Sequence, residues 1–450
     1  MTRFAPSGPL RGTLRTPPDK SISHRAALIG AMGEGETSIE SYLDAADTRA
    51  TLHAVQQLGA GAEWSHGEQA GSMDLKISGI GLRGPGEHWR GGDQEIDVGN
   101  AGTLLRILPG WLAGQRTGAW KLDGDESIRR RPMDRIAEPL ALMGADISCR
   151  EGRLTPVRVQ GAQLRGISYR LPVASAQVKS CLLVAGLLAG GETSVVEPAT
   201  TRDHTERMLV AAGAEVVVTE LRTVPAVQGG PVRRIAVRPV DDLAPGPISV
   251  PGDFSSAAFL AVAAAIVPGS RVRLEQVGLN PTRIGLLGIL NRMGAAVEVE
   301  EHPPLGGSEP LGAIVARHGP LAATRVHGDE VSLAIDELPL VALAGCFAEG
   351  RTVVSGAREL RHKESDRIAT VVDGLRAIGA EVEALDDGFA VSGSGGLRGG
   401  ALDAHGDHRL AMLGAVAGLA SRDGVEVAGA DAAAVSYPRF EADLASLLAA

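Results

Sequence analysis

Aromatic residues and cysteines are scarce in this chain of 450 residues. Phe, Trp and Tyr make up 3% of it while hydrophobic residues make up 44%, so Ala, Val, Leu and Ile must build the core. Such a composition favours closely packed helices and strands over a large pocket lined by aromatic rings. The three cysteines, Cys149, Cys181 and Cys346, are far apart and form no C-x-x-C pair, which predicts reduced core residues in a cytoplasmic protein.

An excess of positive charge is also absent, and so are long apolar runs. The formal net charge of −10 argues against a nucleic-acid-binding surface, and any anionic ligand must be held by local cations. No stretch of about 18 residues is apolar without polar interruption, so we expect no membrane-spanning helix. The N-terminal residues lack the hydrophobic region of a signal peptide, which also favours the cytoplasm.

A repeated pattern of two helices and two strands runs through the sequence. It returns about six times, at intervals of roughly 75–80 residues, and the last copy is truncated. In each copy a polar segment leads into a small apolar helix, and a second, amphipathic helix ends before a glycine. Each of these glycines is followed by alanine, at Gly59, Gly144, Gly213, Gly294 and Gly379. A glycine after a helix fits a left-handed C-terminal cap.

The length predicts two domains, because 450 residues exceed one ordinary hydrophobic core. Proline clusters at 17–18 and 239–251 indicate stiff connectors. We therefore expect residues 19–248, the first three repeats, to form one lobe, and residues 1–18 with 249–450 to form the other. The chain would then cross between the lobes twice, which makes a natural hinge.

Polar segments with Lys or Arg precede several of the apolar helices, first of all at 19–25. A helix N-terminus offers unpaired N–H groups and the positive end of its dipole, which suit a phosphate or carboxylate. Any single cation could instead form a surface salt bridge, but recurrence at equivalent positions favours one anion-binding cleft where the helices converge. The cations at such starts or on adjoining loops are Lys20, Arg25, Arg106, Arg131, Arg202, Lys363, Arg367 and Arg409.

Two carboxylates stand out beside these cations. Asp336 precedes an apolar helix, and Glu364 adjoins Lys363, so both could exchange protons near neutral pH. The alternatives are a helix cap for Asp336 and a surface charge cluster at 361–367. The segment 405–408, His-Gly-Asp-His, lacks a third obvious ligand, so we expect no metal site.

The motifs of these segments resemble those of the 5-enolpyruvylshikimate-3-phosphate synthase family, in order and over nearly the whole chain. They are Asp19-Lys20-Ser21-Ile22-Ser23-His24-Arg25, Gly99-Asn100-Ala101-Gly102-Thr103, Arg131-Pro132-Met133, Ser175-Ala176-Gln177, Lys363-Glu364-Ser365-Asp366-Arg367 and Asp407-His408-Arg409. The resemblance implies a two-lobed inside-out α/β barrel. Each lobe would hold three β-α-β-α-β-β units around a pseudo-threefold axis, with helices inside and sheets outside.

The resemblance also implies an activity. The enolpyruvyl group of phosphoenolpyruvate would pass to the 5-hydroxyl of shikimate 3-phosphate, with release of phosphate, in the pathway to aromatic amino acids. A cytoplasmic monomer without metal or organic cofactor is implied, with these two small molecules as its partners and neither nucleic acid nor membrane.

Roles for single residues follow from the resemblance by position. Asp336 resembles the acceptor of the hydroxyl proton, Lys363 would orient that hydroxyl, and Glu364 would manage the proton at the methylene carbon. Lys20 is the third residue expected to be catalytic, and the sequence leaves open which proton it moves. The residues that resemble ligands of shikimate 3-phosphate are Lys20, Ser21, Arg25, Ser175, Ala176, Gln177 and Arg202. Those that resemble the phosphoenolpyruvate site are Lys20, Asn100, Gly102, Arg131, Gln177, Arg367 and Arg409.

Two positions refine this expectation. Some members have a lysine where Val435 stands, so that contact to phosphoenolpyruvate must be absent or supplied elsewhere. The Ser-Ala-Gln segment at 175–177 resembles the second class of the family, in which tolerance to glyphosate goes with Ala at the site of Gly102. The glycine therefore predicts an enzyme that glyphosate inhibits.

Two other functions stay open at this point. An enolpyruvyl transferase acting on UDP-N-acetylglucosamine would share the fold, but it typically has Lys-Asn in place of Lys20-Ser21 and a cysteine on a mobile loop. A non-catalytic sensor of phosphorylated metabolites would not need Asp336 and Glu364 together with Lys363.

Overall fold

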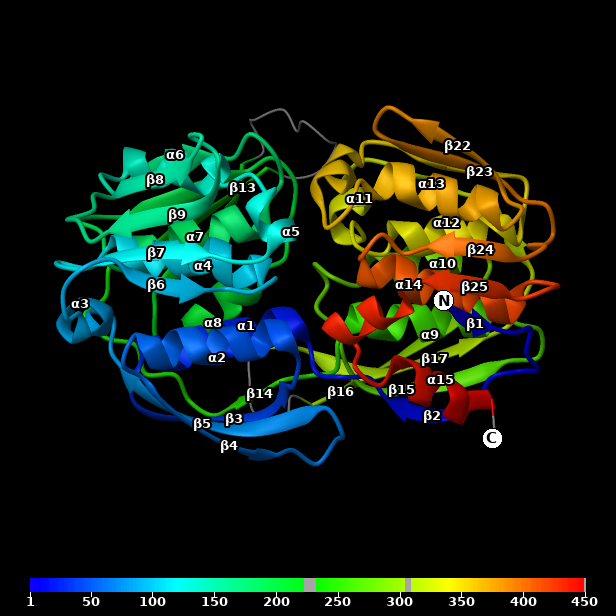
Figure 1. Cartoon of the computed structure of the whole chain (residues 1–450), viewed down its shortest axis with the longest axis horizontal. Coiled ribbons are helices and arrows are strands. Elements are labelled where there is room, and N and C mark those ends of the chain that lie inside the picture. Colours follow the sequence, from blue (N-terminus) through cyan, green and yellow to red (C-terminus); the bar gives the residue numbers. More distant parts are fainter. Residues whose placement is uncertain (222–231, 304–308, 449–450) are drawn as a thin grey trace. The chain divides into compact units, whose positions relative to one another are not determined.

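The computed structural model describes residues 1–221, 232–303 and 309–448, and it divides into two compact units (Figure 1). The N-terminal unit comprises Pro18–Val250 with Glu309, and the C-terminal unit comprises Met1–Pro17, Pro251–Pro303 and Pro310–Ala450. The division falls within two residues of the boundaries at 18/19 and 248/249 that the proline clusters suggest.

The N-terminal unit contains three repeats, each with a helix that is almost wholly buried. These first helices are α1 (Lys20–Met32), α4 (Gly102–Ala113) and α7 (Ala176–Gly186). The second helices are α2 (Ala46–Gln57), α6 (Asp134–Leu142) and α8 (His204–Ala211), with short helices α3 (Gly84–His88) and α5 (Glu126–Arg129) in the connections. Gly110 allows α4 to approach α7 closely, because a Cβ there would lie 2.2 Å from the carbonyl oxygen of Cys181.

Each repeat of the N-terminal unit has a four-stranded sheet with the same order and directions. The strands, in order across each sheet, are β14 (Ile248–Ser249), β3 (Glu34–Leu43), β5 (Ser72–Ile80) and β4 (Gly61–His66); β6 (Gln94–Asp97), β7 (Ala119–Asp123), β9 (Leu154–Gln160) and β8 (Asp146–Arg150); and β10 (Ser168–Arg170), β11 (Thr193–Glu197), β13 (Arg233–Val237) and β12 (Val216–Glu220). The first pair of each sheet is parallel and the other pairs are antiparallel.

The C-terminal unit repeats this design around helices α9 (Phe254–Ile266), α12 (Leu338–Cys346) and α14 (His408–Ala420). Every residue of α9 and α12 is buried, as expected of helices that are apolar on all sides. The second helices are α10 (Gly285–Arg292), α13 (Arg367–Ala377) and α15 (Phe440–Leu448). The connections contain α11 (Asp329–Leu333) and the 3₁₀ helices η1 (Arg358–His362) and η2 (Ala430–Val435).

The sheets of the C-terminal unit follow the same order, and its last sheet is completed from the start of the chain. The strands are β2 (Arg11–Arg15), β15 (Arg271–Gly278), β17 (Leu311–Arg317) and β16 (Ala296–His302); β19 (Arg325–Val326), β21 (Arg351–Val354), β23 (Gly388–Ser392) and β22 (Glu381–Leu385); β24 (Gly400–Asp403), β25 (Val425–Ala428) and β1 (Thr2–Phe4); and the small pair β18 (Leu321–Ala322) and β20 (Ala348–Glu349).

The first strands of two sheets come from distant parts of the chain. β2 precedes α1 but pairs in parallel with β15, placing Leu14 opposite Leu274. β14 precedes α9 but pairs in parallel with β3, placing Ile248 opposite Ile39. The predicted repeat of helices and strands is therefore confirmed. The truncated sixth copy is also explained, because β1 supplies its missing strand.

Candidate functional site

The N-terminus of α1 carries the first group of predicted residues. Asp19 caps this helix by accepting a hydrogen bond from the backbone N–H of Ile22 at 2.9 Å. The ammonium group of Lys20 lies 3.1 Å from Oδ2 of Asp47, at the start of α2. Ser21, one residue further on, contributes its backbone carbonyl oxygen to Arg25 at 2.9 Å.

Arg25 connects three helices of the N-terminal unit. Its Nε donates to Oγ1 of Thr205 on α8 at 2.7 Å, and its Nη2 donates to Oγ of Ser180 on α7 at 3.1 Å. Burial lowers the pKa of Arg25 to about 10, the carboxylate of Glu206 opposes this shift, and the charge of Arg202 adds to it. The structure therefore brings Arg25 and Arg202 close enough to interact, and two cations in one place favour a bound anion.

Gln177 links α7 to the start of α4. Its Oε1 accepts a hydrogen bond from Nη1 of Arg106 at 2.7 Å, and its Nε2 donates to Oγ1 of Thr103 at 3.2 Å. Ser175 is the N-cap of α7, where its hydroxyl oxygen accepts from the N–H of Val178, and Ala176 is the first residue of that helix.

Arg131 lies against the first residue of α4. Its Nη2 is 3.5 Å from Oδ1 of Asn100, and its Nη1 would be 2.6 Å from a Cβ at Gly102. Asn100 is itself held by Oδ2 of Asp125 at 2.6 Å. Because Gly102 has no side chain, the guanidinium group of Arg131 can occupy this position.

A buried ionic cluster that the sequence did not predict is formed by Lys179, Glu197 and Glu206. The ammonium of Lys179 is 2.9 Å from Oε2 of Glu197 and 2.6 Å from Oε1 of Glu206, and all three side chains are buried. Burial alone would lower the pKa of Lys179, but the two carboxylates outweigh it and raise that pKa. The signal that could have revealed this cluster was a lysine within an otherwise apolar helix. The cluster connects α7 to β11 and α8, and the segment that contains Arg202 lies between β11 and α8 in the sequence.

His24 makes the stability of the N-terminal unit dependent on pH. Its ring is buried, with Nδ1 2.6 Å from Oγ1 of Thr51. Burial lowers its pKa from 6.5 to about 3; Asp47 opposes the shift, and Lys20 and Arg25 add to it. Between these two values the unfolded chain binds a proton that the folded chain does not. The free energy of unfolding should therefore fall as the pH falls, by up to about 1.4 kcal/mol per pH unit.

We expect His24→Asn to flatten this dependence, measured as chemical unfolding midpoints between pH 7 and pH 4. His53→Asn, at an exposed position on α2, is the matched control and should follow the wild type. Equal pH dependence in wild type and His24→Asn would contradict the assignment.

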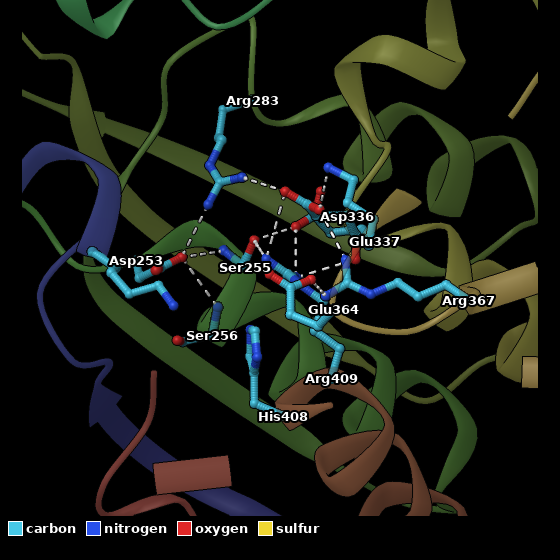
Figure 2. A network of polar contacts seen from close by, with 12 residues as sticks. Asp253, Ser255, Ser256, Arg283, Asp336, Glu337, Glu364, Arg367, His408 and Arg409 are labelled. Atoms are coloured by element: carbon cyan, nitrogen blue, oxygen red, sulfur yellow. Dashed lines mark hydrogen bonds and ion pairs between the residues drawn. The ribbon is translucent and has the colours of Figure 1, made fainter. Parts of the chain in front are cut away.

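The predicted residues of the C-terminal unit converge on Arg367, the first residue of α13 (Figure 2). Its side chain is 1% exposed and contacts three carboxylates: Asp407 at 2.8 Å, Asp336 at 3.1 Å and Glu364 at 2.6 Å. Burial opposes the charged form, but these carboxylates outweigh it and raise the pKa of Arg367. In turn Arg367 holds the pKa of Asp407 below its usual value in spite of burial.

Asp336 directs its carboxylate at cations and does not cap a helix. Helix α12 begins at Leu338 with Glu337 as its N-cap residue. Oδ1 of Asp336 lies 3.3 Å from the ammonium of Lys363 and 3.1 Å from Nη1 of Arg367. Because the side chain of Arg367 is buried and the neighbouring Lys363 is only 25% exposed, the segment 361–367 is not a surface charge cluster either.

Arg409 joins α14 to the starts of α9 and α12 (Figure 2). Its Nη1 donates to the backbone oxygen of Asp336 at 3.1 Å and to Oε1 of Glu337 at 3.3 Å, and its Nη2 donates to Oγ of Ser255 at 3.1 Å. Ser255 also donates a short hydrogen bond to Glu337.

Ser255, Glu337 and Asp407 belong to the network but were not predicted as site residues. The signal was present at the polar starts of these helices, because Glu337 and Asp407 directly precede α12 and α14 and Ser255 lies in the first turn of α9.

Within residues 1–221, 232–303 and 309–448, no group of three or more His, Cys, Asp and Glu side chains could hold a metal ion. Over the same residues, no helix has the length and apolar character needed to cross a bilayer.

The two units, each with three buried helices backed by sheets, have the fold of enolpyruvyl transferases. An enolpyruvyl transferase from Streptomyces tendae superposes with a TM-score of 0.72 over 99% of this chain and 96% of that one, at only 17% identity. The predicted inside-out α/β fold is thereby confirmed.

The chain belongs to the EPSP synthase family. The family profile of EPSP synthase (3-phosphoshikimate 1-carboxyvinyltransferase) matches residues 4–444. A 3-phosphoshikimate 1-carboxyvinyltransferase from a Synechococcus strain is 45% identical over 99% of this chain and 96% of its own length. The EPSP synthase structure from Acinetobacter baumannii has a TM-score of 0.82 at 40% identity, covering 99% of this chain and 97% of that one. The resemblance inferred from the motifs is confirmed.

Proposed function

We propose that this chain transfers the enolpyruvyl group of phosphoenolpyruvate to the 5-hydroxyl of shikimate 3-phosphate and releases phosphate. The observation that carries the proposal is the carboxylate of Asp336, held by Lys363 and Arg367 in a unit whose family performs this reaction. Such a carboxylate is placed to accept a proton from a hydroxyl group that Lys363 orients.

The reaction is an addition followed by an elimination. Asp336 accepts the proton of the 5-hydroxyl while the hydroxyl oxygen bonds to C2 of phosphoenolpyruvate, and Glu364 supplies a proton to the C3 methylene. In the elimination, the Glu364 carboxylate, which gave up its proton in the addition, takes a proton back from the C3 methyl group. The C2–C3 double bond forms again, the bond from C2 to the phosphate oxygen breaks, and phosphate leaves. Glu364 is suited to proton exchange because its side chain is 24% exposed while Arg367 holds one of its oxygens at 2.6 Å.

Both substrates are anions that repel each other, so cations must bind them. We propose that phosphoenolpyruvate is held by Lys20, Asn100, Gly102, Arg131, Gln177, Arg367 and Arg409. We propose that shikimate 3-phosphate is held by Lys20, Ser21, Arg25, Ser175, Ala176, Gln177 and Arg202. Each close pair of opposite charges contributes roughly 4 kcal/mol at about 4 Å and an effective dielectric constant of 20, before desolvation. We further propose a cytoplasmic monomer.

The cysteines argue against the transferase acting on UDP-N-acetylglucosamine as the alternative. Burial raises the pKa of Cys149 to about 11 and those of Cys181 and Cys346 to about 12, so none is a reactive thiolate at neutral pH.

The test is release of phosphate from phosphoenolpyruvate in the presence of shikimate 3-phosphate or of UDP-N-acetylglucosamine. We expect release only with shikimate 3-phosphate. Release with UDP-N-acetylglucosamine alone would establish the other transferase, and binding without release would establish a sensor. Light scattering under the assay conditions measures the molar mass of the protein, which should be that of a monomer.

Gly102→Ala should weaken the site for phosphoenolpyruvate. The added methyl group would lie 2.6 Å from Nη1 of Arg131 and must displace it. Because small displacements of a binding group have large effects, we expect KM for phosphoenolpyruvate to rise about 10-fold to 100-fold. Glyphosate should inhibit the wild type and inhibit the variant less.

The control is Gly288→Ala on α10, where a Cβ meets nothing within 4 Å. Wild-type activity that survives millimolar glyphosate at low phosphoenolpyruvate would contradict the prediction of inhibition. An unchanged KM in Gly102→Ala would contradict the role of Arg131.

A further inference from the structure

Arg283 is a buried cation that neither the motifs nor the proposed reaction accounts for. It lies in the loop between β15 and α10, and its side chain is 4% exposed. The internal repeat gives it a counterpart, since Arg202 occupies the loop between β11 and α8, also two residues before the second helix. Arginines therefore stand at equivalent places in the third and fourth repeats.

The side chain of Arg283 bridges two carboxylates of the network (Figure 2). Its Nη1 is 3.7 Å from Oδ2 of Asp336, and its Nη2 is 3.4 Å from Oδ1 of Asp253. Asp253 is itself fixed as the N-cap of α9, where Oδ1 accepts from the backbone N–H of Ser255 at 2.7 Å. Arg283 thus connects the start of a rigid, buried helix to the carboxylate proposed to accept the substrate proton.

The two oxygens of Asp336 face different cations. Oδ1 has the short contacts, with Lys363 at 3.3 Å and Arg367 at 3.1 Å. Oδ2 faces Arg283 and Arg409, both at 3.7 Å. Cations on both sides fix the rotation of the carboxylate and favour its ionised form.

We propose that Arg283 is a positioning residue for the proton transfer, which holds the Asp336 carboxylate ionised and in the orientation in which it accepts the proton of the 5-hydroxyl. The inference rests on the proposed function. Burying a guanidinium group costs desolvation free energy. Arg283 faces two carboxylates, one of which is fixed because it caps a helix, and this arrangement indicates a role beyond filling the core.

The charged surroundings of Asp336 set the expected pH effect. The groups that face it or its partners from the neighbouring elements are Arg283, Asp253, Glu337, Lys363, Glu364, Arg367, Asp407 and Arg409. Removing one of the four cations around Asp336 makes protonation of its carboxylate easier. The acidic limb of the kcat profile should therefore move to higher pH by about 1 unit.

The experiment compares kcat and KM of Arg283→Gln, Arg283→Lys and Arg317→Gln with the wild type from pH 5 to pH 9. Arg317 pairs with Glu298 on the surface of the same unit, so its variant controls for loss of an arginine. We expect Arg283→Gln to lower kcat about 10-fold to 100-fold and to move the acidic limb to higher pH, with KM for both substrates little changed. Arg283→Lys keeps the charge but not the geometry, so its acidic limb should stay at the wild-type pH while its kcat falls only about 3-fold to 10-fold.

An acidic limb in Arg283→Gln that coincides with that of Arg317→Gln would overturn the proposal, whatever the change in KM. Thermal unfolding shows whether Arg283→Gln folds. If it does not, Arg283→Lys decides: a kcat lowered about 3-fold to 10-fold at wild-type KM supports positioning, and a wild-type kcat refutes it. Absence of turnover in the wild type would instead refute the proposed function, and this inference with it.

Discussion

Asp336→Asn should lower kcat by about 10²-fold to 10⁴-fold, because the amide cannot accept the proton that the attacking hydroxyl must lose. Asn has nearly the shape of Asp, so the contacts of its side chain with Lys363 and Arg367 weaken but the fold is retained. Phosphate release at saturating substrates measures the loss. Binding of shikimate 3-phosphate should change little, because most of its proposed ligands belong to the N-terminal unit and the amide introduced by Asp336→Asn can still hydrogen-bond its 5-hydroxyl.

Asp431→Asn is the control for this prediction, since Asp431 is an exposed acid of η2 in the same unit. Turnover that stays intact in Asp336→Asn, while a change at Arg367 abolishes binding, would show that the network binds anions without providing the base. The assignment of Asp336 as proton acceptor would then fail.

Arg367→Ala should destabilise the C-terminal unit and abolish binding of phosphoenolpyruvate. The substitution leaves Asp407, whose side chain is 0% exposed, without the guanidinium group that lies 2.8 Å away. Breaking a buried ion pair by removing one partner costs about 3–5 kcal/mol, because the remaining charge stays buried and uncompensated. Thermal or chemical unfolding measures this loss, and equilibrium binding measures the loss of affinity.

A double variant separates the ion pair from simple loss of packing. Arg367→Ala combined with Asp407→Ala should recover part of the stability lost in the single variant, because the most deeply buried of the three carboxylates that Arg367 contacts is then removed as well. Arg376→Ala, at an exposed position on the same helix, should have little effect. Equal stability of Arg367→Ala and Arg376→Ala would rule out a stabilising role for the network.

The sign of the pH dependence follows from the same pair. The pKa of Asp407 in the folded protein lies below its ordinary value of 3.8 because of Arg367. Its contribution to stability is therefore fully present above pH 3.8 and is lost as the pH falls through the lower, folded pKa. Loss of stability between pH 6.5 and pH 4 comes instead from groups such as His24, whose folded pKa of about 3 lies far below 6.5.

The features that the sequence determined are local ones. Apolar composition on all sides predicted the buried helices, and the polar segments expected before them contain the N-caps Asp19 and Ser175. The glycines after the second helices have the expected positive φ, as at Gly59 (112°) and Gly379 (99°). Each of these signals acts over one or two turns of chain, so the residues that carry it are neighbours in the sequence.

Which charges meet was decided only by the tertiary structure. Arg25 reaches Thr205 across 180 positions, Arg409 reaches Ser255 across 154, and Arg283 meets Asp253 from another element of the same unit. Such pairs depend on the way three buried helices bring their N-terminal ends together, and no local pattern encodes a partner that far away. The sequence therefore determined which residues could do the chemistry. The packing of small side chains between helices decided which carboxylate each cation holds.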